Sequence, residues 1–457
     1  VGSKGSHYRE NYDYLLLSPG SMPLRPPIAG IENENIFTLR NIPDMDRIKA
    51  ALETKGAKDA LVVGGGFIGL EMAENLRRRG LEVTLVELAG QVFLPADPEM
   101  ADILHRHISL NGVKLFLADG VKEFKNSARN SLEVLLHSGR VISTDMAVLA
   151  IGVRPDSGFL KGSGIAMNAH GAIIVNSRMQ TNIESIYAVG DAIEVTDFNS
   201  GRKAQVPLAG PANRQGRIAA DNIAGFKSEY KDTQGTAICK IFDLTAAVTG
   251  INEKNAKKYG LTFTKSYTHS PNHATYYPKA FSLSVKILFN KETHKLLGAQ
   301  IIGKEGVDKR IDVFATAIRN GLTVYDLTEL ELAYAPPFGS AKDAVNMAGF
   351  VAQNIIEDKV DVFYAEEVAG IDSQKQILLD VRTEEENKNG AIEGSKLIPV
   401  DSLRQRLGEL NKNKEIMVYC QVGLRGYFAC RILTQNGFKT RNLSGGYKTY
   451  SSFQTPD

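Results

Sequence analysis

Cys420 and Arg425 lie at the two ends of a short glycine-bearing stretch that could hold sulfur as an anion. An apolar, β-prone run leads into the stretch, and a helical run from Tyr427 to Gln435 follows it. Backbone N–H groups of such a loop, together with a helix N-terminus, stabilise a thiolate relative to a thiol. Arg425 would add a fixed positive charge beside the sulfur. The spacing therefore predicts a reactive thiolate at Cys420.

A second chemical motif is the G-x-G-x-x-G pattern formed by Gly64, Gly66 and Gly69. It follows a predicted buried strand at 60–63 and opens a predicted helix at 70–79. In this setting Gly64 makes a tight turn, Gly66 lets a pyrophosphate approach the backbone, and Gly69 allows close helix–strand packing. The pattern therefore predicts a dinucleotide whose pyrophosphate rests on the helix N-terminus.

The acidic residue that usually accompanies this pattern is Glu87, 18 positions after Gly69 at the end of a predicted strand. Its carboxylate would accept a hydrogen bond from the adenine ribose 2′-OH and repel a 2′-phosphate, which favours NADH over NADPH. We also expect Ile68 and Gly152 at this site. Glu71 is either a dipole partner for the first helical turn or a side chain reaching toward the nicotinamide, and spacing leaves both open.

The composition describes the protein that must position these residues. A chain of 457 residues is too long for one core, so two to four domains are expected. The hydrophobic fraction of 43%, the charged fraction of 23% and the net charge of +2 favour a globular protein without nucleic-acid or membrane partners. Three cysteines indicate a reducing, cytoplasmic setting. His107, His170 and His269 have no metal-ligand spacing, so no metal is expected.

Periodicity divides the chain into three regions of predicted structure. The first has strands at 13–17, 60–63, 82–87, 132–136, 146–151 and 183–189, with helices at 44–55, 70–79 and 213–224. The second has strands at 237–242, 246–250, 262–268, 281–289 and 296–302, with helices at 308–320 and 340–355. The third has strands at 377–381, 396–399 and 415–419, with helices at 403–410 and 427–435. The expected class is α/β, with an α+β domain between.

Two segments carry a family resemblance. Residues 12–20, ending in Ser18-Pro19-Gly20, and residues 185–192, ending in Gly190-Asp191-Ala192, resemble motifs of FAD-dependent pyridine nucleotide–disulfide oxidoreductases. The resemblance implies FAD- and NAD-binding Rossmann-like domains. It also implies that Asp191 binds the ribityl or pyrophosphate region of FAD.

The resemblance narrows to one branch of that family. Residues 207–216, which begin Pro207-Leu208-Ala209, and residues 334–343 look like coenzyme A-disulfide reductases, NADH oxidases and NADH-dependent persulfide reductases. This implies coenzyme A as a further ligand and a homodimer in which the partner subunit completes the active site. Tyr334 is then the candidate tyrosine near the reacting sulfur, although a packed interface tyrosine is equally consistent with the sequence. Phe338 occupies a position where a tyrosine would also have fitted.

The last region resembles a rhodanese domain. The matching pieces are 379–383, 390–395, the loop from Cys420 to Arg425, and 442–447. The resemblance implies that Cys420 accepts a sulfane sulfur as a persulfide cradled by loop N–H groups. Asp380 and Arg382 would form a structural pair under the loop. Cys239 and Cys430 are expected in the core.

The chain departs from the family at its beginning. A first G-x-G-x-x-G for FAD and a redox-active cysteine near the flavin are not found, so we expect a fragment of a longer protein in preference to a truncated, non-reducing relative. The expected division is FAD-binding domain at 1–57 and 181–230, NAD-binding domain at 58–180, dimerisation domain at 231–356, linker at 357–370 and rhodanese domain at 371–457.

Together these observations predict a flavoprotein that uses FAD, NADH and coenzyme A. It would reduce persulfide, polysulfide or coenzyme A-disulfide substrates, and its rhodanese domain would handle sulfane sulfur. One alternative is an NADH oxidase with a passenger rhodanese domain. Another is a non-reducing sulfurtransferase scaffold.

Overall fold

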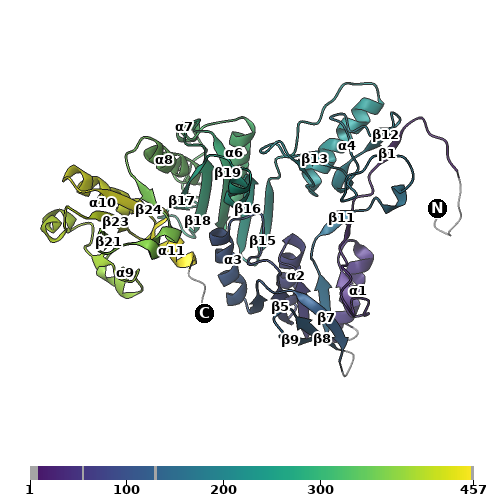
Figure 1. The fold of residues 1–457 in the computed structure, drawn as a ribbon, viewed down its shortest axis with the longest axis horizontal. Helices are drawn as coiled ribbons and strands as arrows, with labels where there is room; N and C mark the ends of the chain where they lie inside the picture. The colour runs from purple at the N-terminus through teal and green to yellow at the C-terminus, as the bar shows by residue number, and fades with distance from the viewer. Residues whose placement is uncertain (1–8, 54–55, 128–130, 454–457) are drawn as a thin grey trace. The chain divides into compact units, whose positions relative to one another are not determined.

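The computed structural model describes residues 9–53, 56–127 and 131–453, and it divides into two compact units. The first unit comprises residues 1–72 and 119–235, and the second comprises residues 73–118 and 236–457. The division falls within helix α2 (Phe67–Arg78). Figure 1 labels many of the elements of both units.

Short strands build the first unit. In it, β10 (Met146–Leu149) lies between β3 (Ile36–Thr38) and β4 (Asp59–Val63), all parallel. A separate antiparallel sheet contains β7 (Val121–Asn126), β8 (Leu132–Leu136) and β9 (Val141–Thr144). The remaining pairs are β1 (Leu15–Leu17) with β12 (Ile186–Ala188), β2 (Ser21–Pro23) with β11 (Val153–Pro155), and β13 (Val195–Thr196) with β14 (Lys203–Ala204). Its helices are α1 (Ile42–Glu53) and α4 (Ala209–Ile223).

The second unit opens with β5 (Glu82–Val86), α3 (Pro98–Leu110) and β6 (Val113–Phe116), the two strands being parallel. An antiparallel sheet of order β15-β16-β19-β18-β17 follows. Its strands are β15 (Ala237–Ile241), β16 (Leu244–Gly250), β17 (Thr264–Pro271), β18 (Ser282–Phe289) and β19 (Leu296–Gly303). The associated helices are α5 (Glu253–Lys258), α6 (Val307–Arg319), α7 (Val324–Glu329) and α8 (Ala344–Ile356).

The last module of this unit is a parallel sheet of order β20-β24-β23-β21-β22. Its strands are β20 (Val362–Phe363), β21 (Gln376–Asp380), β22 (Lys396–Leu397), β23 (Glu415–Tyr419) and β24 (Thr440–Leu443). Helices α9 (Glu384–Lys388), α10 (Leu424–Gln435) and α11 (Gly446–Ser452) accompany them. Strand β23 is an almost wholly buried apolar run, which suits a central strand covered on both faces.

One expected helix is wrong, and five helices of the described residues were not expected: α3, α5, α7, α9 and α11. Residues 403–410 form two short 3₁₀ turns, Leu403–Gln405 and Leu407–Glu409, because Gly408 lowers the helical propensity of this short stretch. Helix α3 was not predicted because its buried face includes the charged residues Glu99 and Asp102, which interrupt the apolar periodicity. Its start does carry a local signal, since Pro98 follows the N-cap Asp97.

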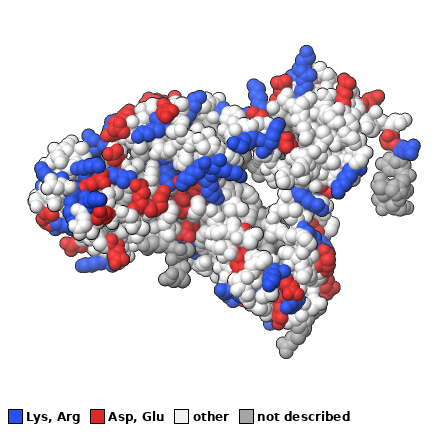
Figure 2. All heavy atoms as spheres, in the orientation of Figure 1, with Lys and Arg blue, Asp and Glu red and all other residues white. Residues whose placement is uncertain are grey.

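Charged side chains of both signs are interspersed on the face drawn in Figure 2, in keeping with the net charge of +2. Among the described residues, no helix is both long and apolar enough to cross a membrane.

Candidate functional site

Cys420 lies where β23 ends and is fully buried, with 0% of its surface exposed. Gly423 donates its backbone N–H to the Cys420 Sγ at 3.1 Å. Gly423 has a φ of +95°, a conformation that suits glycine, and it is the N-cap of α10. The sulfur therefore faces a loop N–H at the start of a helix, an arrangement that stabilises a thiolate or a terminal persulfide.

Arg425 does not present its charge alone. It makes a two-pronged ion pair with Glu386 of α9, with N–O distances of 2.6 and 2.8 Å. This hydrogen bonding to Arg425 lowers the pKa of Glu386 to about 2. Glu386 also accepts from the backbone N–H of Thr383, so the pair fixes the start of α9 against the loop.

A second buried ion pair lies under the loop. Arg382 donates to the Asp380 carboxylate at 2.8–3.1 Å, with both side chains almost completely buried. Arg382 also donates to the Gln421 side-chain oxygen at 3.3 Å, and its guanidinium lies 4.3 Å from the centre of the Tyr447 ring. The prediction that Asp380 and Arg382 form a structural pair is confirmed.

The backbone of helix α11 is hydrogen-bonded to the loop that carries Cys420. The backbone N–H of Tyr447 donates to the Cys420 carbonyl at 2.7 Å, and that of Lys448 donates to the Gln421 carbonyl at 2.9 Å. Gly446 allows this approach, because a Cβ at that position would lie 2.5 Å from the Cys420 carbonyl oxygen. The loop conformation is thus held by backbone contacts from α11.

The same helix contacts the antiparallel sheet on its other side. Thr449 lies 2.8 Å from His269 Nε2 on β17, and the Lys448 ammonium donates to the Ser282 hydroxyl at 2.8 Å. His269 also bonds Ser284, and burial lowers its pKa to about 3, so it is neutral. His269 thus has a hydrogen-bond partner at each ring nitrogen.

The glycine turn has the geometry expected of a nucleotide-binding turn. Gly64 has a φ of +108°, and a Cβ there would lie 2.4 Å from the Ala150 carbonyl oxygen. A Cβ on Gly69 would lie 1.9 Å from the Gly64 carbonyl oxygen, while one on Gly66 would meet nothing within 4 Å. Ile68 is 37% exposed at the start of α2. The described residues fit a bound dinucleotide, because space is left open beside Gly66.

The other residues expected at this nucleotide lie in several elements. Glu71 is exposed on α2. Glu87 is half-buried directly after β5, and its carboxylate accepts the Ala89 N–H at 2.8 Å. Gly152 follows β10 with a φ of +110°. Their nucleotide contacts stay predictions.

The two segments that resemble FAD motifs lie together in the first unit. Strands β1 and β12 are paired, and the Ser21 hydroxyl donates to the Asp191 carboxylate at 3.0 Å. Gly190 N–H donates to the buried Gln215 of α4 at 2.8 Å. The remaining expected residues lie between β1 and β2, in the turn at Gly190 and at the start of α4: Ser18, Pro19, Gly20, Ala192, Pro207, Leu208 and Ala209. A carboxylate held beside a glycine turn fits the expected FAD contact.

Tyr334 is 48% exposed, and its hydroxyl lies 3.2 Å from that of Tyr276. This hydrogen bond raises the pKa of Tyr276. Phe338 is 71% exposed. Tyr276 was not predicted, and its signal in the sequence is the tandem with Tyr277 in a loop between strands.

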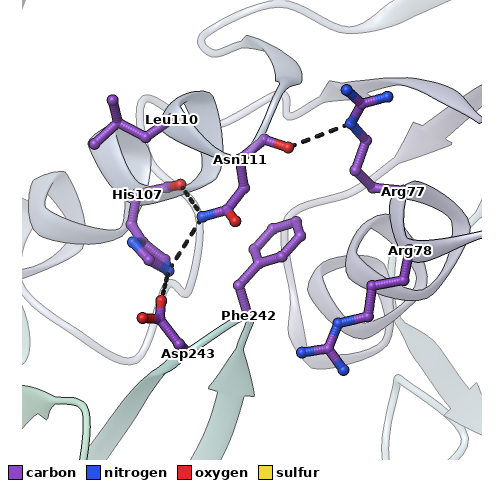
Figure 3. A pocket seen from close by; sticks show the side chains of 7 residues that line it. All are labelled: Arg77, Arg78, His107, Leu110, Asn111, Phe242 and Asp243. Atoms are coloured by element: carbon purple, nitrogen blue, oxygen red, sulfur yellow. Dashed lines mark hydrogen bonds and ion pairs between the residues drawn. The ribbon is translucent and has the colours of Figure 1, made fainter. Parts of the chain in front are cut away.

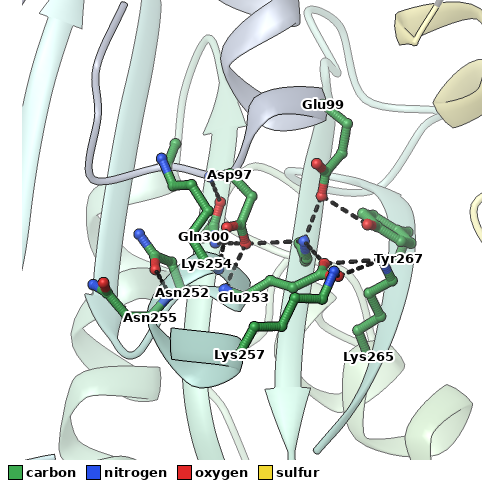
Figure 4. Close-up of polar contacts among 12 residues, drawn as sticks. Asp97, Glu99, Asn252, Glu253, Lys254, Asn255, Lys257, Lys265, Tyr267 and Gln300 are labelled. Atoms are coloured by element: carbon green, nitrogen blue, oxygen red, sulfur yellow. Dashed lines mark hydrogen bonds and ion pairs between the residues drawn. The ribbon is translucent and has the colours of Figure 1, made fainter. Parts of the chain in front are cut away.

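A buried ionic cluster also escaped prediction (Figure 4). Asp97, Glu99 and Glu253 bring carboxylate oxygens within 4.8 Å of one another, a grouping that could hold a metal ion. The Lys286 ammonium lies among them, 2.9 Å from Asp97, 2.7 Å from Glu253 and also bonded to Glu99. Lys265 adds a second ammonium, 2.8 Å from Glu253. The negative charges of the three carboxylates are thus paired with the ammonium groups of Lys286 and Lys265.

A cavity of about 530 Å³ lies between the ends of α2 and α3 and the β15–β16 turn (Figure 3). Its lining residues are Arg77, Arg78, His107, Leu110, Asn111, Phe242 and Asp243. Asp243 lies 2.7 Å from His107 Nε2 and also pairs with Lys304. Burial lowers the pKa of His107. None of the expected site residues lines this cavity.

Comparison with known families gives three matches. Residues 2–216 match the model for pyridine nucleotide-disulphide oxidoreductases, and residues 236–345 match the dimerisation domain of the same family. Residues 365–453 match the rhodanese-like domain. The chain is 36% identical to the NADH oxidase of Methanocaldococcus jannaschii over 79% of this chain and 80% of that protein. It is 37% identical to the coenzyme A disulfide reductase of Staphylococcus epidermidis over 76% of this chain and 77% of that protein.

Two solved structures are similar over nearly the whole chain. The reduced Bacillus anthracis CoADR-RHD is 49% identical, with a TM-score of 0.95, covering 98% of this chain and 81% of that one. The NAD-dependent persulfide reductase from A. fulgidus is 38% identical, with a TM-score of 0.90, covering 96% of this chain and 80% of that one. At 98% and 96% of this chain, both similarities extend over nearly all of its described elements.

Proposed function

Because the chain belongs to the pyridine nucleotide-disulphide oxidoreductase family and also carries a rhodanese-like domain, we propose an NADH-dependent flavoprotein reductase of persulfide, polysulfide or coenzyme A-disulfide substrates. The rhodanese domain handles the sulfane sulfur. The observation that carries the proposal is Cys420, whose Sγ faces the Gly423 N–H at the start of α10. A nucleotide turn and a sulfur cradle in one chain link hydride chemistry to sulfur transfer.

Cys420 is the proposed nucleophile of the sulfur-transfer step. A loop N–H directed at Sγ stabilises negative charge on the attacking thiolate and then on the persulfide product. Helix α11 keeps the loop in this shape through the Cys420 and Gln421 carbonyls. Arg425 and Glu386 hold α9 against the same loop, so we assign Arg425 a positioning role.

The nucleotide sites supply the reducing side. When bound, NADH and FAD provide the hydride and electron-pair chemistry that opens an S–S bond. Gly64, Gly66 and Gly69 would hold the NADH pyrophosphate, and Glu87 would bind its ribose. Asp191 would hold FAD from the turn at Gly190. Coenzyme A, free or as a disulfide or persulfide, is the proposed sulfur-bearing ligand.

The proposal includes the assembly and the location of the protein. The dimerisation-domain match supports a homodimer in which Tyr334, bonded to Tyr276, is offered to the partner's active site. A cytoplasmic location is supported by three free cysteines, all buried and none paired in a disulfide.

An NADH oxidase is the second candidate, favoured by the likeness to the M. jannaschii NADH oxidase. An NADH oxidase activity would not use the Cys420 thiol or the loop N–H that faces it. NADH consumption measured with and without oxygen, and with coenzyme A persulfide added, separates the two. Turnover that needs oxygen and ignores the persulfide would favour the oxidase.

The direct test of the sulfur-transfer step is Cys420→Ser. We expect sulfur transfer to a thiol acceptor to be lost, while NADH-dependent reduction of the bound flavin is retained. Cys430→Ala is the matched control, since burial raises the pKa of Cys430 to about 12 and leaves its thiol protonated and inert. Unchanged sulfur transfer in Cys420→Ser would remove Cys420 from the mechanism.

A further inference from the structure

We propose that the Cys420 loop exchanges sulfur with persulfides carried on uncharged, apolar arms and discriminates against small dianionic donors such as thiosulfate. The inference rests on the proposed sulfur-transfer role of Cys420 and adds the substrate class to it. It is drawn from the charges and the apolar side chains that surround the loop.

The loop's own cation is neutralised. Arg425 directs two guanidinium nitrogens at the two oxygens of Glu386, at 2.6 and 2.8 Å. Both side chains are about one-third exposed, so this pair is accessible to a charged molecule in solution. A guanidinium bound in this two-pronged way has its best donor directions occupied and offers little net charge to an incoming anion.

The second cation near the sulfur is also paired. Arg382 is bound to Asp380 under the loop and is 1% exposed, so its charge is cancelled and out of reach of a donor. Gln421 and Val422, the two residues that follow Cys420, are uncharged. The net charge contributed by both arginines and their carboxylate partners is therefore zero, so a dianion gains no attraction from an unpaired arginine at this loop.

Apolar side chains border the loop where α10 begins. Leu424 is 51% exposed and Phe428 is 50% exposed. They are four residues apart on the helix, so they lie on the same face and form a stripe leading from the loop. An arm of methylene and amide groups would cover this stripe and lower the exposed apolar area, whereas thiosulfate has no such arm.

The transfer step needs no outside oxidant or reductant. The Cys420 thiolate attacks the outer sulfur of R–S–SH, a new S–S bond forms, and the old S–S bond breaks. The arm leaves as the thiolate R–S⁻, and Cys420 carries –S–SH. With thiosulfate the same attack would expel sulfite, a dianion to which the paired Arg425 and Arg382 offer no uncompensated charge.

The test compares two donors on the full-length protein. The probes are thiosulfate and the persulfide of N-acetylcysteamine, whose arm is uncharged. We expect kcat/KM for the alkyl persulfide to exceed that for thiosulfate by at least about 100-fold, the combined size of one missing charge-assisted hydrogen bond and one uncovered apolar stripe. Equal or higher kcat/KM for thiosulfate would overturn the inference.

Two variants test the cause. Glu386→Gln frees the Arg425 charge and should raise the thiosulfate-to-persulfide ratio of kcat/KM by at least about tenfold. Glu385→Gln is the matched control, because it makes the same charge change at an exposed neighbour on α9. Leu424→Lys places a cation at the start of α10 and leaves the hydrogen bonds of Glu386 to the start of α9 unchanged. This variant should also raise the thiosulfate-to-persulfide ratio of kcat/KM. A ratio unmoved in both Glu386→Gln and Leu424→Lys contradicts the charge argument.

The outcomes also separate this inference from the proposed function. If the wild-type protein transfers sulfur from neither donor, the sulfur-transfer role of Cys420 fails. If it transfers sulfur through Cys420 but prefers thiosulfate, the role stands and only the specificity inference fails.

Discussion

Replacing Lys286 by methionine should strongly destabilise the second unit. The Lys286 side chain is 0% exposed and its ammonium contacts three carboxylates, those of Asp97, Glu99 and Glu253. Methionine keeps much of the volume but removes the charge. Three carboxylates that are 0%, 5% and 11% exposed would then lack their central partner.

The magnitude follows from that burial. Removing one partner of a buried ion pair costs about 3–5 kcal/mol, because the remaining charge stays desolvated and unpaired. Burial alone would lower the pKa of Lys286, but the three carboxylates outweigh burial and raise it. The folded protein therefore favours the charged ammonium form of Lys286. At about 2–4 °C per kcal/mol, the melting temperature should fall by roughly 10 °C.

The assay is thermal unfolding of the purified full-length protein at neutral pH, with Lys304→Met as the matched control. Lys304 pairs with Asp243 at 2.5 Å, but the two side chains are 42% and 55% exposed, so that loss should cost less than about 1 kcal/mol. Lowering the pH toward 5 should narrow the gap between Lys286→Met and wild type, since the stranded carboxylates then take up protons. A Lys286→Met protein as stable as the control would refute the reasoning.

Two further predictions concern acid stability and nucleotide binding. Burial alone would raise the pKa of Glu253, but the neighbouring lysines outweigh it and lower the pKa from 4.5 to about 2. The carboxylate therefore contributes on the order of 2 kcal/mol above pH 4.5 after allowance for solvent screening, and this contribution is lost as the pH falls toward 2. Urea unfolding from pH 6 to pH 3 should show a larger loss of stability in the wild type than in Glu253→Gln. Gly69→Ala places a Cβ 1.9 Å from the Gly64 carbonyl oxygen, so NADH affinity by titration calorimetry should fall at least about tenfold and stability by about 1–3 kcal/mol. Gly216→Ala, whose Cβ meets nothing within 4 Å, should leave NADH binding unchanged, and a similar loss there would contradict the steric argument.

Local patterns predicted the elements whose burial repeats regularly along the chain. Strand β23 occurs at 415–419 as expected, because a central parallel strand is one continuous apolar run. The glycine turn was predictable for a similar reason, since close backbone approach at Gly64 and Gly69 excludes a side chain. The Asp380–Arg382 pair is also local, two residues apart.

Long-range charge pairing was not predictable from one sequence. Helix α3 buries Glu99, which breaks its apolar periodicity, and the partner that compensates is Lys286, 187 positions away. The free positive charge expected at Arg425 is likewise cancelled by Glu386, 39 positions earlier. Nothing in the spacing of either residue identifies its partner, so both pairings emerge only in the folded chain.

Because α11 is hydrogen-bonded both to the Cys420 loop and to the antiparallel sheet, the rhodanese-like domain is not independent of that sheet. The helix holds the Cys420 and Gln421 carbonyls on one side and bonds β17 and β18 on the other. A cut before residue 365 would yield a fragment that keeps the Cys420 loop but lacks the strands β17 and β18 to which α11 is bonded. Sulfur transfer measured on such a fragment would report on a loop without this support, so it would underestimate the proposed activity of the full chain.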